Sequence, residues 1–271
     1  MRMVASAKLH HTQGMTEAFL QYYSNLQSIV KSLGDSPTPN LFSIEEERFE
    51  EMKGAGHTLL IPISSNSGLC GAFNNNIGKA TFKRIQELEQ QGKQVSLLPI
   101  GKKIAHELQK TGRNFNKDFV QLLDKLEKSN TIADISALVA HAIELHQHKE
   151  IDSVEILYHH FKSMGVQTIT NSSLLLDMPQ VSTQKNEDWF TEPSVEELLT
   201  SLFPRLLNAQ VYGILLDSLT SEHAARMLAM QTADDNANNL LKELTLLYNK
   251  TRQQAITNEL IDIMGGQVEK H

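Results

Sequence analysis

The sequence holds one cysteine, Cys70, in 271 residues, so no disulfide can form within the chain. Positive charge is also scarce, because 25 lysines and arginines stand against 32 aspartates and glutamates and give a formal net charge of −7. General nucleic-acid binders usually carry a basic surplus, so this composition argues against that class. No run of about 18 apolar residues is present, and the first residues lack the apolar core of a signal peptide. We therefore expect neither a membrane-spanning helix nor a secretory leader.

The sequence also lacks the motifs of a nucleotide site. Residues 66–76 (NSGLCGAFNNN) join an expected strand to an expected helix, a place where free backbone N–H groups commonly bind phosphate. The nearest lysine, Lys79, is followed by alanine, so the Gly-Lys-Ser/Thr ending of a P-loop is missing, and GxGxxG is missing too. We favour a tight turn whose helix is capped by an asparagine, with Cys70 as a small, buried, unreactive side chain.

Histidines are frequent, but their spacing does not suit a metal. His159 and His160 are adjacent in an expected strand, so they point to opposite faces of a sheet. His141 and His148 share a helix face, yet no carboxylate or cysteine completes a ligand set around them. Solvated surface histidines are the favoured interpretation. Because no carboxylate pair and no nucleophile elbow stands out either, the sequence predicts no catalytic, metal-binding or cofactor-binding residues.

Helical patterns mark both ends of the chain. In residues 1–33, apolar and aromatic side chains recur at alternating steps of four and three, which is typical of a coiled-coil helix. They are Met15, Phe19, Tyr22, Leu26, Ile29 and Leu33. The Gly- and Pro-rich residues 34–39 are then expected to end this helix.

Residues 41–193 alternate between strand and helix patterns. Short apolar runs predict strands at 57–63, 94–100, 154–161 and 167–176, and amphipathic spacing predicts helices at 74–91, 102–110 and 132–148. This order predicts a Rossmann-like α/β domain with a partly parallel sheet. Residues 177–193 are polar and are expected to form a surface loop.

The segment that begins at residue 194 predicts an unusually long helix. After Pro204 it contains no proline, its only glycine before Gly265 is Gly213, and it is rich in strong helix formers. A helix of about 60 residues is about 90 Å long, which a domain of ordinary size cannot cover. The helix therefore has to extend beyond the domain and find a partner.

The last third of this segment carries a second seam at alternating steps of three and four. Its members are Met230, Ala233, Ala237, Leu240, Leu244 and Leu247. We expect residues 194–271 to pair with residues 1–33 as an antiparallel, left-handed coiled coil, with the α/β domain inserted between them. A coiled-coil scaffold protein with an α/β domain is the alternative, and a small-molecule enzyme is less favoured because the loop chemistry is missing.

Three stretches of the chain resemble the gamma subunit of F-type ATP synthases. Residues 222–266 (EHAARMLAMQTADDNANNLLKELTLLYNKTRQQAITNELIDIMGG) are similar to the C-terminal helix of that family in the ARM, RQ and IT-x-E groups. Residues 1–9 (MRMVASAKL) are similar to its KMVAASKL segment, and residues 67–76 to its GLCG turn. The likeness runs from end to end and is most specific at the C-terminus.

This resemblance implies a rotor that is not itself catalytic. In the family, the paired terminal helices form a shaft inside a hexamer of alternating alpha and beta subunits. The α/β domain forms a foot beside the epsilon subunit, on the membrane-embedded c-ring. Proton flow turns the ring, and the shaft drives the beta subunits through ATP synthesis or hydrolysis. The resemblance implies one copy per complex, no cofactor, no nucleic acid, and a peripheral location on the cytoplasmic face of a bacterial inner membrane.

The family's contacts between rotor and stator carry over to particular positions. They fall on Met1, Arg226, Arg252, Gln253, Thr257 and Glu259. The resemblance implies that the RQ and IT-x-E residues meet the catch loop of a beta subunit and that Met1 lies near the beta-subunit lever. From the residues alone, Arg252 and Gln253 are polar side chains at or beside a seam, and they can equally face water.

The chain departs from the family pattern in four ways. The family has further helix before the position of Met1, so we expect helical turns to be missing here, by truncation or by a misassigned start. Ser67 stands where the family often has a basic residue, and residues 267–271 differ from the family's tip. The cysteine pair of the chloroplast redox switch is absent, which argues against thiol regulation.

Overall fold

A computed structural model describes residues 2–33, 56–126, 132–174, 192 and 194–268. The chain divides into two compact units, Met1–Leu228 and Ala229–His271. The helix-ending cluster expected at 34–39 and, apart from Glu192, the surface loop expected at 177–193 lie outside the described residues.

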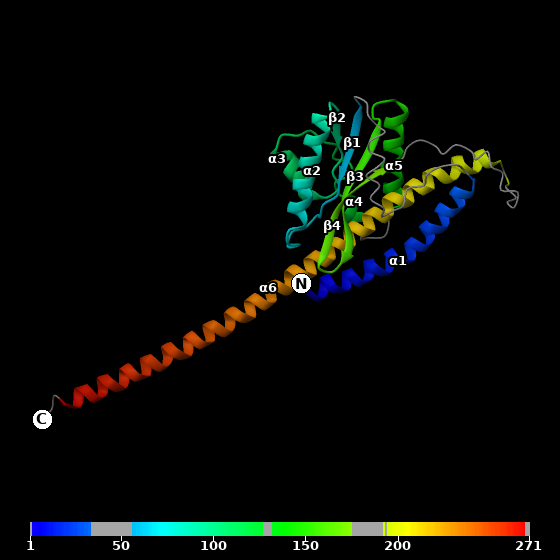
Figure 1. Ribbon diagram of the computed structural model, residues 1–271. Coiled ribbons are helices and arrows are strands. Elements are labelled where there is room, and N and C mark those ends of the chain that lie inside the picture. The colour runs from blue at the N-terminus through cyan, green and yellow to red at the C-terminus, as the bar shows by residue number, and fades with distance from the viewer. Residues whose placement is uncertain (1, 34–55, 127–131, 175–191, 193, 269–271) are drawn as a thin grey trace. The chain divides into compact units, whose positions relative to one another are not determined.

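The first unit is built on a four-stranded sheet (Figure 1). The strands are β1 (His57–Pro62), β2 (Gln94–Leu97), β3 (Ser153–Ser163) and β4 (Val166–Leu174), in the spatial order β2-β1-β3-β4. β1 runs parallel to β2 and to β3, whereas β3 and β4 form an antiparallel pair. The mixed, partly parallel sheet predicted from the order of strands and helices is confirmed.

Helices cover both faces of this sheet. They are α2 (Phe73–Gln90), α3 (Lys102–Lys110), α4 (Leu122–Leu126), α5 (Ile132–Gln147) and, at the two ends of the chain, α1 (Arg2–Leu33) and α6 (Val195–Val268). Successive residues of a strand point to opposite faces, so the run Leu59-Leu60-Ile61 serves two cores. Leu60 packs with α2 and α3, while Leu59 and Ile61 pack with α5 and α6. A strand covered on both faces reads as a continuous apolar run, as β1 does. Among the described helices and strands, only the short α4 was not predicted from the sequence.

The terminal helices α1 and α6 lie antiparallel in the first unit, with the end of α1 beside the start of α6 (Figure 1). Tyr23, Leu26 and Val30 of α1 form one buried cluster with three residues of α6, namely Leu199, Leu206 and Ala209. One turn further along α6, the rings of Phe19 and Tyr212 meet edge to face with their centroids 4.9 Å apart. The predicted pairing of the chain's two ends is present.

The seam on α1 keeps the predicted spacing but sits in a different register. The buried positions are Ala5, Leu9, Thr12, Tyr23, Leu26 and Val30, with Phe19 partly buried. Tyr22 and Ile29, which were predicted to be in the seam, are 54% and 40% exposed. The chain offers neighbouring apolar pairs at Tyr22-Tyr23 and Ile29-Val30, so spacing alone cannot choose between two adjacent stripes. The packing partner makes that choice.

The sequence prediction also placed the α1 partner too far along α6. The described contacts of α1 lie on the early part of α6, around Leu199, Leu206 and Tyr212, rather than at the seam of residues 230–247. At 1.5 Å per residue, α1 spans about 48 Å and α6 about 111 Å, so α1 can cover less than half of α6. Since α1 ends beside the start of α6, it pairs with the first part of that helix, and the later seam is left for another partner.

Candidate subunit interface

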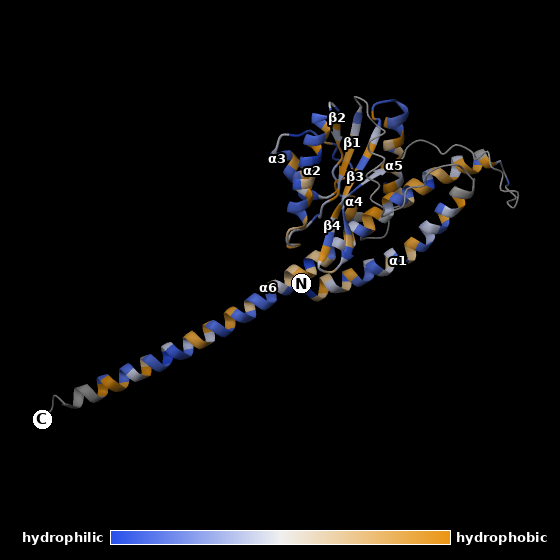
Figure 2. Cartoon of the chain, in the orientation of Figure 1, coloured by the Kyte–Doolittle hydropathy of each residue, from blue (hydrophilic) through white to orange (hydrophobic). Residues whose placement is uncertain are grey.

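The second unit is a helix whose side chains face solvent. Every residue from Gln231 to Ile263 is exposed, and Figure 2 shows apolar and polar residues interspersed along this part of α6. The exposed large apolar side chains are Leu240, Leu241, Leu244, Leu246, Leu247, Tyr248, Ile256, Leu260, Ile261 and Ile263. Monomeric proteins rarely leave a contiguous apolar surface of this kind in water, so it marks a protein interface.

The apolar residues form stripes on this helix. At 100° per residue, Leu240, Leu244 and Leu247 fall on one face, with Leu241 and Tyr248 beside them. After Leu247 the next three heptad positions are filled by Thr251, Gln254 and Asn258, and only Ile261 is apolar again, while Ile256 and Ile263 lie on the opposite face. Packing against a single partner helix would require one continuous apolar stripe along this helix. Stripes that change face indicate a surrounding surface built from several elements.

The predicted contact residues of the RQ and IT-x-E groups lie in this exposed region. Arg252 and Glu259 are seven residues apart and share a face, with Ile256 between them. Gln253 and Thr257 lie one turn apart, and the Thr257 hydroxyl donates a hydrogen bond to the Gln253 carbonyl at 2.8 Å. A hydroxyl bonded back to its own helix adds no strong polar site. The charged and amide side chains are therefore the groups best suited to a partner.

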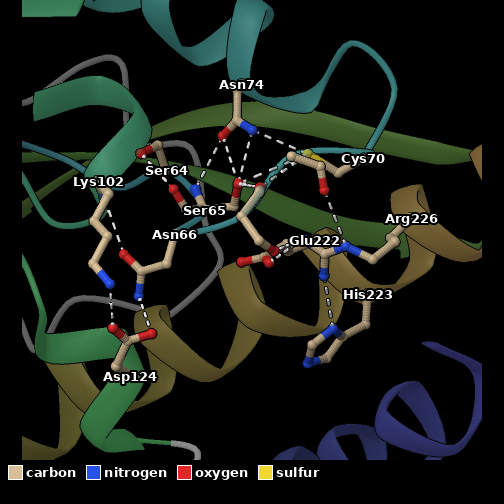
Figure 3. A network of polar contacts seen from close by, with 12 residues as sticks. Ser64, Ser65, Asn66, Cys70, Asn74, Lys102, Asp124, Glu222, His223 and Arg226 are labelled. Atoms are coloured by element: carbon tan, nitrogen blue, oxygen red, sulfur yellow. Dashed lines mark hydrogen bonds and ion pairs between the residues drawn. The ribbon is translucent and has the colours of Figure 1, made fainter. Parts of the chain in front are cut away.

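The other two predicted contact residues stand differently. Met1 lies outside the described residues. Arg226 lies in the first unit, where its guanidinium is directed at its own chain (Figure 3). Its Nη2 donates to Ser67 Oγ at 2.8 Å and to Glu222 Oε1 at 2.6 Å, and its Nε donates to the Gly68 carbonyl at 3.4 Å. The Arg226 side chain is only 16% exposed, so most of its hydrogen-bonding capacity is used internally.

The turn that Arg226 holds is itself braced from behind. Leu69 and Gly71 have positive φ values of 63° and 58°, which fold the backbone back sharply between β1 and α2. Asn74 anchors this loop, because its Oδ1 accepts a hydrogen bond from the Ser65 amide at 3.0 Å and its Nδ2 donates to Cys70 Sγ at 3.0 Å. The tight turn expected from the sequence is present, and Cys70 is buried in it. The expected asparagine cap is wrong: Ala72 is the N-cap residue of α2 and makes no side-chain cap.

A neighbouring contact network ties the loop to α3 and α4. Asn66 Oδ1 accepts a hydrogen bond from the Lys102 amide at 3.0 Å, and Asn66 Nδ2 donates to Asp124 Oδ1 at 2.7 Å. Lys102 Nζ closes the triangle with an ion pair to Asp124 Oδ2 at 2.9 Å (Figure 3). These side chains bind backbone groups and one another, so the network supports the loop and is not a catalytic arrangement.

The interpretation of the β3 histidines as solvated surface residues is wrong, because His159 lies in the core and the partly buried His160 is bound to α6. His159 is 2% exposed, and its ring stacks on Phe73 at 4.0 Å. Burial lowers its pKa from 6.5 to about 4. His160 pairs with Asp217 of α6 at 2.7 Å, and the other Asp217 oxygen accepts the Phe161 amide at 3.0 Å. The strand alternation was predicted correctly, but both faces of this strand turn out to be covered.

A second bond joins α6 to the same strand. The Ser221 hydroxyl donates to the His159 carbonyl at 2.9 Å. Together with Asp217, it fixes α6 to β3 one turn before Arg226 fixes α6 to the 67–68 turn. No cluster of histidine, cysteine, aspartate and glutamate suited to a metal ion occurs among the described residues.

The chain matches a family model described as ATP synthase over residues 1–268. It is 45% identical to the ATP synthase gamma chain of Parabacteroides distasonis over 268 residues, covering 98% of this chain and 90% of that protein. It is 41% identical to the ATP synthase gamma chain of Bacteroides fragilis over 277 residues, covering 99% and 92%.

Solved structures show a similar fold at low identity. A chain of the Euglena gracilis mitochondrial ATP synthase, described as OSCP/F1/c-ring, matches with a TM-score of 0.56 and 18% identity, over 98% of this chain and 95% of that one. A chain of the Tetrahymena thermophila mitochondrial ATP synthase, described as central stalk/c-ring, matches with a TM-score of 0.54 and 22% identity, over 86% and 97%. Within the described residues, no helix combines the length and apolar character needed to cross a membrane.

Proposed function

Because this chain belongs to the ATP synthase gamma-chain family, we propose that it is the central-stalk rotor subunit that couples ring rotation to ATP synthesis and hydrolysis. It is the mechanical subunit of the complex and makes or breaks no bond itself. The observation that carries this proposal is α6, a single helix from Val195 to Val268. Its first part is buried in the α/β domain and its last part, from Gln231 to Ile263, is exposed.

This division of α6 suits the transmission of torque. The buried part is fixed to the sheet through Asp217 and Ser221 and to the 67–68 turn through Arg226. Torque applied to the domain therefore reaches the helix through several directional bonds as well as through apolar packing. The exposed part offers leucines and charged side chains to a surrounding protein surface. A rotating shaft needs one part that is fixed to its own domain and another part that contacts the surrounding subunits.

The partners follow from the family. The bearing is the hexamer of alpha and beta subunits, and the α/β domain meets the epsilon subunit and the c-ring, with one copy of this chain per complex. The complex sits at the cytoplasmic face of a bacterial inner membrane, since the relatives of highest identity named above are bacterial. The chain reaches that membrane through its partners.

Five residues are proposed as contacts with the stator: Met1, Arg252, Gln253, Thr257 and Glu259. The helical geometry supports the last four, since their side chains are exposed and lie within two turns of one another. For Arg226 we propose a different role. Its donors serve Ser67, Gly68 and Glu222, so it braces the root of the shaft rather than meeting a beta subunit.

The test is reconstitution of the complex with altered shaft residues. The double variant Arg252→Ala/Gln253→Ala is expected to keep the fold and to lower ATP-driven proton pumping in membrane vesicles. The matched control is Asn258→Ala on the same helix, which lies on the side away from both Arg252 and Gln253. Unchanged pumping in the double variant would remove the contact role of these two residues.

A separate measurement distinguishes the rotor from a coiled-coil scaffold. A rotor co-purifies with alpha and beta subunits at one copy per three beta subunits. A scaffold forms homo-oligomers through the exposed stripe, and these would appear in sedimentation of the chain alone. A chain that sediments as a stable homo-oligomer and never joins the hexamer is incompatible with the proposed function.

A further inference from the structure

The first unit contains a cavity that the rotor role does not use. It lies among α1, α5 and α6 and has a volume of about 360 Å³. Small-molecule sites usually measure roughly 300–1,000 Å³, so this one has room for a compact ligand of one or two rings. Its described lining residues include neither the 67–68 turn nor any of the proposed contact residues.

The walls of the cavity are largely aromatic. Phe19 and Tyr22 come from α1, and Tyr212 comes from α6. The centroid of the Phe19 ring lies 6.1 Å from that of Tyr22 and 4.9 Å from that of Tyr212, so the three rings form one continuous surface. Ile135 of α5 and Ala209 of α6 complete the apolar lining. Such a surface favours a flat aromatic body, which can stack on one ring and meet another edge to face.

Two polar side chains are placed on this apolar lining. Arg205 is exposed at the cavity and forms no ion pair or hydrogen bond with the described residues, so its charge is available. Asn208 donates through Nδ2 to Ser136 Oγ at 3.1 Å, whereas its Oδ1 is buried and accepts no hydrogen bond from the described residues. A few convergent polar groups on an apolar wall are what orient a bound ligand.

We propose that this cavity binds a small aromatic carboxylate, with its ring among Phe19, Tyr22 and Tyr212 and its carboxylate on Arg205. Charge complementarity selects an anion, because Arg205, the cationic group lining the cavity, has no ion-pair partner among the described residues. The planar guanidinium can also donate two parallel hydrogen bonds to the two oxygens of a carboxylate. A neutral or cationic aromatic ligand has no such pair of oxygens. Since α1 and α6 both line the cavity, such a ligand would bind both terminal helices at once.

The test is a titration of the full-length chain with 2-naphthoate, followed by the backbone amide signals of Tyr22, Ile135 and Ala209. Saturable shifts confined to these and neighbouring residues are expected. Arg205→Glu should weaken 2-naphthoate binding at least about tenfold, which is the usual effect of losing a hydrogen bond to a charged group. The same variant should gain affinity for 2-naphthylmethylammonium, because the sign of the rim charge is reversed.

The matched control is Lys79→Glu, which makes the same charge change at an exposed lysine of α2 that does not line the cavity. It should leave both affinities unchanged. A second variant, Tyr22→Ala, removes an aromatic wall that is 54% exposed and should weaken binding without unfolding the chain. Equal 2-naphthoate affinity in Arg205→Glu and Lys79→Glu would overturn the proposal, as would shifts confined to the exposed leucines of α6.

The assembled complex provides the last arm of the test. Uptake of 6-fluoro-2-naphthoate, followed by its fluorine signal, should again depend on Arg205. A complex that takes up none while the isolated chain binds would mean that a neighbouring protein covers the cavity, and that result overturns a small-molecule site. Neither result bears on the rotor role, which is measured by proton pumping.

Discussion

Arg226 Nη2 lies 2.8 Å from Ser67 Oγ and joins two residues that are 159 positions apart in the chain. The bond connects α6 to the turn between β1 and α2, just before the first unit ends at Leu228. A basic side chain at position 67 would repel Arg226 at this distance. The Ser67 hydroxyl instead accepts a hydrogen bond from the guanidinium, and this bond holds the turn against the helix.

We therefore expect Arg226→Met to lower the free energy of unfolding of the first unit by about 1–3 kcal/mol, because bonds from a charged donor to Ser67, Gly68 and Glu222 are lost. Ser67→Ala removes one of these bonds and should cost less. Urea unfolding of the full-length chain measures both. Ser221→Ala gives a comparison at a different bond between α6 and the sheet. If Arg226→Met unfolds at the same urea concentration as the parent chain, the guanidinium does not stabilise the first unit.

The buried His159 predicts a specific loss of stability in acid. Its pKa is lowered from 6.5 to about 4 in the folded chain, by burial. The unfolded chain therefore takes up a proton at this residue near pH 6.5, while the folded chain resists it until about pH 4. The stabilising contribution is complete above pH 6.5 and is lost as the pH falls from 6.5 to about 4. The difference in pKa corresponds to about 3 kcal/mol.

His159→Phe is expected to reduce this pH dependence. The phenyl ring keeps the stack on Phe73 and takes up no proton. Thermal or urea unfolding between pH 4 and pH 7.5 should give a flatter stability curve for the variant. His160 is the adjacent histidine and pairs with Asp217, so His160→Gln provides the control for a change at a neighbouring histidine. Parallel curves for His159→Phe and the parent chain would show that His159 does not set the acid response.

The elements could largely be predicted from the sequence, because each depends on local spacing. The strand His57–Pro62, the helix Phe73–Gln90 and the long helix Val195–Val268 all appear close to the expected bounds. Register could not be predicted in the same way. At Tyr22-Tyr23 the sequence offers two apolar residues side by side, and only the tertiary partner decides that Tyr23 is buried.

The supporting contacts were missed for a related reason. Arg226 belongs to a family motif, and Asp217 is one acidic residue in a helix. Neither position in the sequence predicts that the side chain binds another part of the same chain. Their roles depend on Ser67 and His160, which lie far away in sequence. Nor could the burial of His159 be foreseen, because strand alternation predicts two faces without stating that both are covered. The proposed stator-contact residues, by contrast, rest on a local motif in a single helix, so they could be proposed without tertiary information.

The exposed part of α6 yields a last prediction, about order rather than stability. Residues 231–263 have exposed side chains throughout, so in the isolated chain their helix lacks the tertiary packing that stabilises most helices. Their amides should exchange with deuterium much faster than those of residues 211–220, which are mostly buried against the sheet and its helices. On assembly with alpha and beta subunits, exchange at 231–263 should slow at least about tenfold, since a bound partner stabilises only the folded helix.

Mass spectrometry of proteolytic fragments measures both segments in one experiment, and 211–220 serves as the internal control. If residues 231–263 are already as protected as the control segment in the isolated chain, the helix needs no bearing surface to stay ordered.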